Sequence, residues 1–450
     1  MIRSTPKVIA PLDPYFEPAA LWERAYRRTV AVERAAEEIY LTVYRGRHSC
    51  GKMAMRIFKH ENAHIRINER AAARWAKFAQ WRFGGDRVAV SGCDALAEAV
   101  SALYGPGKPR AFDFNFFSSV YDGVRAPLPR VLGGYWDGCR VGFDLGASDR
   151  KCAAVKDGEV LFTEEVAWDP GSWSDPSRHL TEIKDSVARA ARHLPRVDAI
   201  GGSTAGVLFG EDVRRSSIFL GVPERDFETG VRPIFGLLRS GYPNAAFAVA
   251  NDGAVTALSG AQALGRGRVL GLAMGSSFAA GYVDADGRLP DSIDELAFVP
   301  IDERCDAPQD EWSKERGCAA QYLSQRGVAR LAKKVKMAED GEPAPDVLKR
   351  IQEKMRQGDK TARDIYRTIG VYFGYAVAQF SYFYDVRDVL VLGRVMTGEG
   401  GAVLLQWAGK VLREEFPEIA DGIVLRTPNE RDKRHGQAVA AASLAPGPAA

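Results

Sequence analysis

The stretch Val141-Gly-Phe-Asp-Leu-Gly-Ala-Ser-Asp-Arg-Lys151 decides the fold of this chain, and Cys152-Ala-Ala-Val-Lys-Asp-Gly158 follows it directly. An apolar run ends at an aspartate, a turn of small residues follows, and a second apolar run leads to Asp157-Gly158. This pattern predicts a strand, a tight turn, a second strand and a hairpin, because Asp-Gly readily adopts the positive φ of a two-residue hairpin. A plain hairpin without any ligand is the competing interpretation.

The turn between the two strands has features of a phosphate site. Gly146 and Ala147 have little or no side chain to cover their backbone N–H groups, so an anion could approach the turn. Asp144 ends the first strand, where its carboxylate could hold a hydrated Mg²⁺ beside that anion. The segments that follow in the chain decide between such a site and a plain hairpin.

Length and composition set the broad class. A chain of 450 residues is too long for one compact core, so two or three domains are expected. Its formal net charge of +3 disfavours a nucleic-acid binder. The sequence has no long apolar run and no signal-peptide pattern, which predicts a cytoplasmic protein that does not bind a membrane. Its six cysteines are scattered, which predicts reduced thiols and no cysteine-rich zinc site.

Residues 1–134 carry no nucleotide signature and are expected to form an N-terminal extension of α+β type. Periodicity predicts a helix over 19–40, strands within 41–68, and helices over 69–83 and 93–104. Arginines interleave with Trp75, Phe78 and Trp81, which is compatible with a nucleic-acid surface. An aromatic core flanked by snorkelling arginines is the favoured interpretation. Residues 124–132 are expected to be a linker.

From residue 135 the pattern becomes α/β and then repeats. Strands are predicted within 141–166 and over 198–206 and 245–250, with helices over 179–194, 231–240 and 256–264. Strand, small turn, strand and Asp-Gly recur over 268–287, which indicates an internally duplicated fold. A helical block over 318–384 is followed by a strand from 389, a helix over 402–415 and a strand over 422–425. The expected domains are 1–134, 135–264 and 265–450.

Asn251-Asp-Gly253 stands between a predicted buried strand and a predicted helix rich in small residues. A turn with an Asx cap is the ordinary interpretation of such a tripeptide. At the end of a strand, beside an amide that can orient a ligand, a carboxylate is also placed to accept a proton from a hydroxyl. The position of Asp252 between two candidate phosphate loops favours a catalytic carboxylate.

Several short segments stand in one order along the chain, namely Asp144-Leu-Gly-Ala-Ser148, Ser203-Thr-Ala-Gly206, Asn251-Asp252, Gly275-Ser-Ser277, Asp294-Glu-Leu-Ala-Phe298, Gly393-Arg-Val395 and Gly398-Glu-Gly400. In order and spacing they resemble the ROK family (repressor, open reading frame, kinase) of the actin-like ATPase and sugar-kinase superfamily, over roughly residues 138–445. The resemblance implies a duplicated, two-lobed, ribonuclease H-like α/β fold, here with an extra N-terminal segment.

The resemblance also implies roles for individual residues. Asp252 would be the general base, and Asp144 would hold Mg²⁺ through water. Contacts to ATP and its phosphates would come from Asp144, Gly146, Ala147, Ser148, Gly275, Ser276, Ser277, Gly393, Gly398 and Gly400. Contacts to a sugar-like substrate would come from Ser203, Thr204, Asn251, Asp252 and Glu295. The implied cofactors are ATP and Mg²⁺, and a homodimer is expected. For Glu295 the alternative interpretation is a solvated acidic turn without a ligand. For the 398–400 segment the alternative is an ordinary strand-to-helix turn.

Two departures from the family pattern concern zinc. Phe298 stands where the family has a histidine that binds zinc and sugar, and the cysteine cluster is reduced to Cys318 with Cys305 thirteen residues earlier. We therefore expect a relative without a zinc site, in which packing around Phe298 replaces the metal.

These observations support an ATP-dependent kinase that phosphorylates a hydroxyl of a sugar or sugar-like molecule, with two lobes closing over the site. Ala147, Ser277 and Phe298 depart from the family pattern and favour an alternative, a non-catalytic sugar or nucleotide sensor that acts through the N-terminal segment. A DNA-binding repressor is disfavoured, because no reading helix is visible in residues 1–134.

Overall fold

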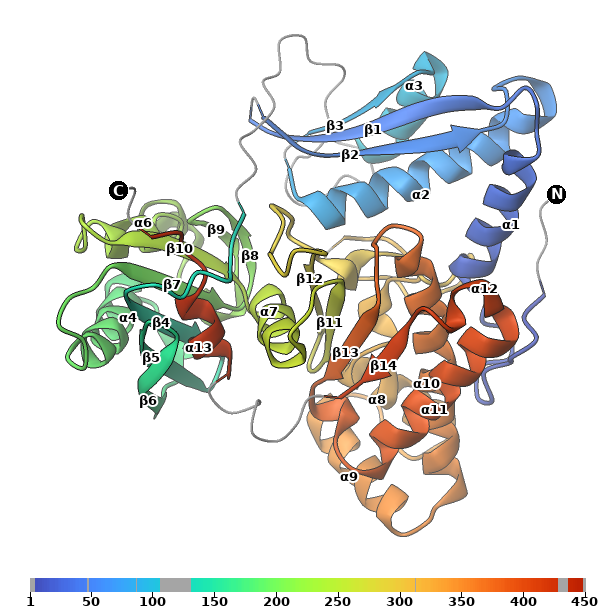
Figure 1. Cartoon of the computed structure of the whole chain (residues 1–450). Helices are drawn as coiled ribbons and strands as arrows, with labels where there is room; N and C mark the ends of the chain where they lie inside the picture. The colour runs from blue at the N-terminus through green and yellow to red at the C-terminus, as the bar shows by residue number, and fades with distance from the viewer. Residues whose placement is uncertain are drawn as a thin grey trace. The chain divides into compact units, whose positions relative to one another are not determined.

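The computed structural model describes residues 5–46, 48–85, 87–105, 131–311, 313–427 and 436–447 (Figure 1). These residues form two compact units. The first unit takes its residues from Met1–Leu128, Ala273–Ala279 and Asp294–Arg426, and the second from Pro129–Leu272, Ala280–Ile293 and Thr427–Ala450. The domain boundaries expected at residues 134 and 264 stay a prediction, and most of the expected linker 124–132 lies outside the described residues.

The second unit is built on a five-stranded sheet with the order β10-β7-β4-β5-β6. The strands are β4 (Cys139–Leu145), β5 (Asp149–Lys156), β6 (Glu159–Ala167), β7 (Ala199–Thr204) and β10 (Ala246–Asn251). β4, β5 and β6 are antiparallel neighbours, whereas β7 and β10 run parallel to β4. The predicted Asp157-Gly158 hairpin is confirmed, with φ values of 48° and 84°. The strands predicted in this region are therefore all confirmed.

Helices cover both faces of this sheet. Alternate side chains of β4, such as Phe143, share a buried apolar core with residues of α4 (Pro176–Ala191). On the opposite face Gly142 and Gly201 let α13 (Gly436–Ala442) approach closely, since an added Cβ would meet α13 backbone oxygens at 1.8 and 1.7 Å. The unit is completed by α7 (Asp252–Leu264), by α6 (Ile234–Arg239), and by a hairpin of β8 (Val207–Phe209) and β9 (Asp212–Arg215), which the sequence did not predict.

A second sheet has the strand order β12-β11-β13-β14, formed by β11 (Val269–Met274), β12 (Phe278–Val283), β13 (Asp388–Leu392) and β14 (Val424–Arg426). The predicted helical block is confirmed as α8 (Gln325–Lys334), α9 (Ala344–Arg356) and α10 (Lys360–Ser381). α10 lies along α11 (Glu399–Glu415), and α12 (Pro417–Ala420) follows (Figure 1). Gly370 and Gly374 permit this close packing, because a Cβ there would meet residues of α11 at 2.5 and 2.6 Å.

The N-terminal part of the first unit is α+β, as predicted. It comprises α1 (Ala19–Ala31), β1 (Glu37–Arg45), β2 (His48–Ile57), α2 (Ile65–Phe83), β3 (Arg87–Ser91) and α3 (Asp94–Tyr104). The three strands form an antiparallel sheet in the order β2-β1-β3, and α2 runs along one face of it (Figure 1). The two α2 tryptophans and Phe78 are buried, as the aromatic-core interpretation expects.

Two predictions in this segment are wrong. The helix predicted over 19–40 ends at Ala31, and residues from Glu37 onward form β1, where Ile39, Leu41 and Val43 are buried in strict alternation. The strand-like alternation from His64 to Asn68 belongs instead to the start of α2. Such short runs of apolar and polar residues fit the periodicity of a helix as well as that of a strand, and tertiary packing decides between the two. Within the described ranges, no helix is both long and apolar enough to cross a membrane.

Candidate functional site

The carboxyl ends of β4, β7 and β10 meet at one edge of the sheet in the second unit. Parallel pairing places Asp144 opposite Ser203, and Thr204 opposite Asn251. Strand ends in a parallel sheet are the usual position for ligands, because helices and loops leave a crevice there. The structure therefore brings together, on three adjacent strands, side chains that are far apart in the sequence.

Asp144 is held in this edge by two neighbours. Its side chain is buried, and its Oδ1 accepts a hydrogen bond of 2.6 Å from the Ser203 hydroxyl. Lys151, opposite Asp144 in the β4–β5 register, has its Nζ 3.7 Å from the Asp144 Oδ2. Burial raises the pKa of Asp144, while the Ser203 hydroxyl and the Lys151 ammonium oppose that shift. The carboxylate is thus fixed in orientation next to a cation.

Asn251 and Asp252 stand where β10 passes into α7. The Asn251 Oδ1 accepts a 2.7 Å hydrogen bond from the Gly253 N–H and caps the helix, and its Nδ2 donates to the Gly206 carbonyl at 2.8 Å. The Asx cap considered from the sequence is therefore present. It coexists with a carboxylate in the first turn of α7, since Asp252 is the first residue of that helix. The cap fixes the backbone that carries Asp252.

Asp252 is electrostatically coupled to Asp144. Burial, and secondarily the nearby negative charge of Asp144, raise the pKa of Asp252 to about 6. The Gly253 N–H, 2.9 Å from the Asp252 Oδ1, partly opposes this shift. A carboxylate with a pKa near the working pH is suited to proton transfer, because both of its protonation states are accessible.

The small-residue turn after β4 is open on its outer side. The Gly146 N–H donates to the Asp149 carbonyl at 2.9 Å, and the Gly146 carbonyl accepts a 2.8 Å hydrogen bond from the Trp168 indole. Ala147 and Ser148 are exposed, and the Ser148 hydroxyl donates to the Asp149 carboxylate at 3.0 Å. The loop is therefore ordered by its own contacts while two of its residues face solvent.

The predicted second phosphate loop lies in the first unit. The Gly275 N–H donates to the Ser277 carbonyl, and the Gly275 carbonyl accepts from the Gln325 N–H, both at 2.9 Å. Ser276 and Ser277 are exposed. Gly393 packs on the backbone just before this loop and has a φ of 103°. A Cβ at this position would lie only 2.4 Å from the Met274 carbonyl oxygen, so no other residue fits. The Gly275 and Gly393 turns are therefore neighbours.

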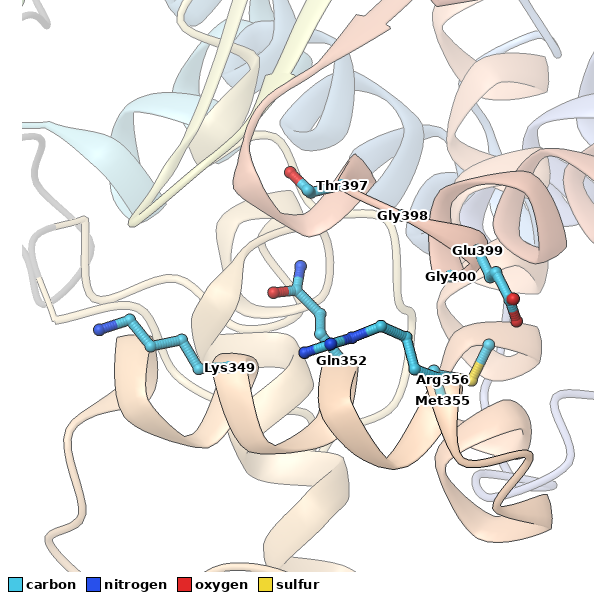
Figure 2. A pocket seen from close by; sticks show the side chains of 8 residues that line it. All are labelled: Lys349, Gln352, Met355, Arg356, Thr397, Gly398, Glu399 and Gly400. Atoms are coloured by element: carbon cyan, nitrogen blue, oxygen red, sulfur yellow. The ribbon is translucent and has the colours of Figure 1, made fainter.

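A pocket of about 350 Å³ opens between α9 and the start of α11 (Figure 2). The carboxamide of Gln352 points up from α9 between the two walls, and its Nε2 donates to the Arg394 carbonyl at 2.8 Å (Figure 2). Gly400 can lie here only without a side chain, because a Cβ would come within 2.3 Å of the buried Tyr366 ring. The lining residues are Lys349, Gln352, Met355, Arg356, Thr397, Gly398, Glu399 and Gly400.

Part of the chain matches a known protein family. A family model described as ROK family matches residues 313–443. Over these residues, less than a third of the chain, the protein is similar to the ROK family. Its fold is the mixed α/β fold of solved ROK structures over 68% of the chain, with an additional N-terminal segment. Among curated proteins, none matches the chain.

Solved structures of ROK proteins share the fold at low sequence identity. A ROK hexokinase from Thermus thermophilus is 19% identical, with a TM-score of 0.54 over 68% of this chain and 97% of that one. A ROK family transcriptional regulator, a homologue of the E. coli MLC protein, has the same identity and TM-score over 68% and 77%. A ROK family protein from Streptococcus pneumoniae, solved with sucrose, is 12% identical, with a TM-score of 0.50 over 68% and 96%.

The segment Asp294–Phe298 begins beside the C-terminal end of α2. The Glu295 N–H donates to the Trp81 carbonyl at 2.7 Å. Phe298 is 8% exposed and stacks at a tilt on the Trp81 ring, with centroids 4.3 Å apart. The Cys318 thiol donates to the Phe298 carbonyl at 3.2 Å. Phe298 is thus packed as expected. Among the described residues, no group of three or more His, Cys, Asp or Glu side chains is placed to hold a metal ion.

The predicted residues fall into distinct clusters. In the second unit, Asp144, Ser203, Thr204, Asn251 and Asp252 lie at the ends of three adjacent strands, next to the 146–148 turn. In the first unit, the 275–277 loop adjoins Gly393. Two further glycines, Gly398 and Gly400, line the pocket, and Glu295 lies at the end of α2. Their functional roles stay predictions.

Sequence reasoning missed Lys151 and the α9 side of the pocket. Lys151 could have been found, because a tight turn after β4 places it opposite Asp144 in the antiparallel register. Lys349, Gln352 and Arg356 could not, since α9 is an ordinary amphipathic helix and no motif marks its pocket side.

Proposed function

We propose that this protein is a ROK family member and an ATP-dependent phosphotransferase that transfers the γ-phosphoryl group to a hydroxyl of a sugar or sugar-like substrate, with Asp252 as general base. The observation that carries the proposal is the pair of carboxylates at the strand ends of the second unit, the buried Asp144 and the half-buried Asp252, whose pKa the charge of Asp144 helps to raise. A carboxyl group whose pKa is raised to about 6 is partly protonated below neutral pH and can accept a proton near pH 7.

Transfer of the phosphoryl group to a hydroxyl requires one group that accepts the hydroxyl proton. The Asp252 carboxylate takes the proton of the acceptor hydroxyl while the acceptor oxygen forms a bond to the γ-phosphorus. The bond from that phosphorus to the bridging oxygen of ADP breaks, and ADP leaves with the electron pair. Asn251 holds the first turn of α7, so the Asp252 backbone does not have to reorganise during this step. Asp144, fixed by Ser203, is the residue that would hold Mg²⁺, which when bound offsets phosphate charge.

The α9–α11 pocket fits the adenosine part of ATP. Its volume of about 350 Å³ lies within the usual range for small-molecule sites. The Gly398 and Gly400 backbone forms one wall, so a flat base can approach without meeting a side chain from those positions. Lys349 and Arg356 add positive charge to the opposite wall. Close to the start of α11, that charge is favourable for the phosphate end of a nucleotide.

A sugar-like acceptor suits the polar groups at the strand ends. Ser203, Thr204 and Asn251 offer hydroxyl and amide groups within the same edge as Asp252, and Glu295 is the further proposed contact. The names of two structural relatives, a hexokinase and a protein solved with sucrose, support a carbohydrate as the substrate class.

An ADP-release screen with Mg²⁺–ATP tests the proposal, with hexoses, amino sugars and sugar-bearing metabolites as acceptors. Asp252→Asn keeps the size of the side chain and removes the base, so kcat should fall by about 10²–10⁴ with the KM for ATP little changed. Asp286→Asn, in an exposed turn of the same unit, is the matched control and should keep wild-type activity. Near-normal turnover by Asp252→Asn would remove Asp252 from the mechanism.

A second candidate is a ligand-responsive regulator that does not turn over ATP. Two observations favour it, the additional N-terminal segment and the similarity to a ROK transcriptional regulator. Calorimetry with the same sugars separates the candidates. Sugar binding without ADP release from any acceptor would favour the regulator, whereas saturable ADP release would favour the kinase.

A further inference from the structure

The loop that carries Glu295 is held at its beginning by the C-terminal end of α2. The Trp81 and Arg82 carbonyls accept hydrogen bonds from the Glu295 and Asp294 N–H groups at 2.7 and 3.0 Å. Carbonyls in the last turn of a helix have no partner within the helix, so a loop N–H can satisfy them. These two bonds place the backbone of Glu295 relative to the N-terminal segment.

The conformation at the start of the loop is unusual for an L-residue. Asp294 has φ of 47°, in the left-handed region that is unfavourable for a residue with a side chain. Its carboxylate accepts a 2.7 Å hydrogen bond from the buried Tyr384 hydroxyl. The Arg82 guanidinium lies over the Tyr384 ring at 4.3 Å. A strained residue persists only where its surroundings enforce it, and here α2 supplies part of that enforcement.

The middle of the loop packs on the same helix. The Phe298 ring lies against the Trp81 ring at 4.3 Å between centroids, and the two side chains are 8% and 2% exposed. From the other side the Cys318 thiol bonds the Phe298 carbonyl. An aromatic pair of this kind is stabilising beyond the area that it buries. The Trp81 side chain therefore stabilises one loop conformation over others.

The far end of the loop is bonded to the segment around α1. The Ala19 N–H donates to the Ile301 carbonyl at 2.9 Å, and the Glu303 N–H donates to the Glu17 carbonyl at 2.8 Å. The Arg304 guanidinium forms a bidentate pair with Asp13, with both N–O distances 3.1 Å. From α2, two arginines, Arg70 and Arg74, form ion pairs with Glu303. The loop is therefore held at both ends and in the middle.

From these contacts we infer that the N-terminal segment, residues 5–104, is a built-in positioning element for the loop 294–304, and that Trp81 sets the position of Glu295 for acceptor binding. This inference rests on the proposed function, in which Glu295 contacts the acceptor. It gives a role to a segment that carries no nucleotide signature in its sequence. Trp81 is a positioning residue, since it acts through the loop and not on the reacting atoms.

The kinetic test compares Trp81→Ala, Trp81→Phe and Trp75→Ala. Trp75 is the matched control, because it lies buried in the same helix but contacts Tyr26 and Glu23 instead of the loop. Trp81→Ala should raise the KM for the best acceptor about tenfold, which corresponds to about 1.4 kcal/mol. Its kcat at saturating acceptor and its KM for ATP should stay within about twofold of wild type. Trp81→Phe should restore most of the acceptor affinity, and Trp75→Ala should lower only the Tm.

A second measurement keeps the inference separate from the kinase proposal. Hydrogen exchange of the peptide that contains Asp294 and Glu295 should be faster in Trp81→Ala than in wild type, and unchanged in Trp75→Ala. Faster exchange together with no ADP release from any acceptor would refute the kinase proposal while the positioning of the loop stands. Wild-type exchange of that peptide in Trp81→Ala, or an acceptor KM that rises equally in Trp75→Ala, would overturn the inference.

Discussion

The strand-end cluster of the second unit and the α9–α11 pocket of the first unit differ in what supplies their chemistry. At the strand ends, side chains supply the chemistry, because Asp144, Ser203 and Asp252 each contribute a polar group that is held by parallel strand pairing or by a helix cap. In the pocket, one wall is backbone, and its key positions are glycines. A side-chain site should fail when one functional group is exchanged, whereas a backbone site should fail when a side chain is added.

The most damaging exchange after Asp252 should be Asp144→Asn. The variant keeps a side chain of the same shape that can still accept the Ser203 hydrogen bond, so folding should be preserved. Loss of the charge should lower kcat by about 10²–10³, as for other preorganised electrostatic groups. Steady-state ADP release checks this, with circular dichroism to verify the fold. A kcat within twofold of wild type would show that the charge of Asp144 has no part in turnover.

Adding a side chain should damage the pocket. In Gly400→Val the new Cβ would fall about where the Tyr366 ring lies, and that ring is fully buried and has no space to move. We expect the KM for ATP to rise about 10- to 100-fold and the protein to lose about 1–3 kcal/mol of stability from overpacking. Gly409→Ala, in the same helix but facing only the flexible Arg413 side chain, is the control and should leave the KM for ATP unchanged. Equal KM values in the two variants would contradict the assignment of the pocket.

The same contrast explains how far the sequence predicts this molecule. Asp144 and Asp252 could be located because each stands at the end of an apolar run, so local periodicity fixes its place on the sheet. The α9 wall of the pocket could not be located from the sequence, because Gln352 reaches the pocket only through the packing of distant helices. The N-terminal hold on the 294–304 loop was equally invisible, since it depends mainly on backbone hydrogen bonds and on one aromatic contact between segments some 200 residues apart.

The coupling of the two carboxylates should also appear in stability. Because the pKa of Asp252 is raised from 3.8 to about 6, the folded state binds its proton more tightly than the unfolded chain does. This contribution to stability is complete below about pH 4 and is lost as the pH rises through about 6. Asp252→Asn carries no such dependence. Relative to wild type, it should be more stable at pH 7, by on the order of 3 kcal/mol at most, and this gain should vanish near pH 4. A difference in Tm that is the same at both pH values would contradict the raised pKa of Asp252.

The smallest expected effect is that of removing zinc. It tests whether the loop 294–304 is held by protein contacts and not by a metal ion. A cysteine binds zinc as its thiolate, but burial raises the pKa of Cys318 to about 12, and its thiol donates a hydrogen bond to the Phe298 carbonyl. Cys305, in contrast, is exposed. A chelator selective for zinc over magnesium should therefore leave the acceptor KM within twofold, in wild type and in the Cys318→Ser variant alike. If chelation instead raised the acceptor KM and added zinc restored it, the α2 contacts would not be what holds Glu295 in place.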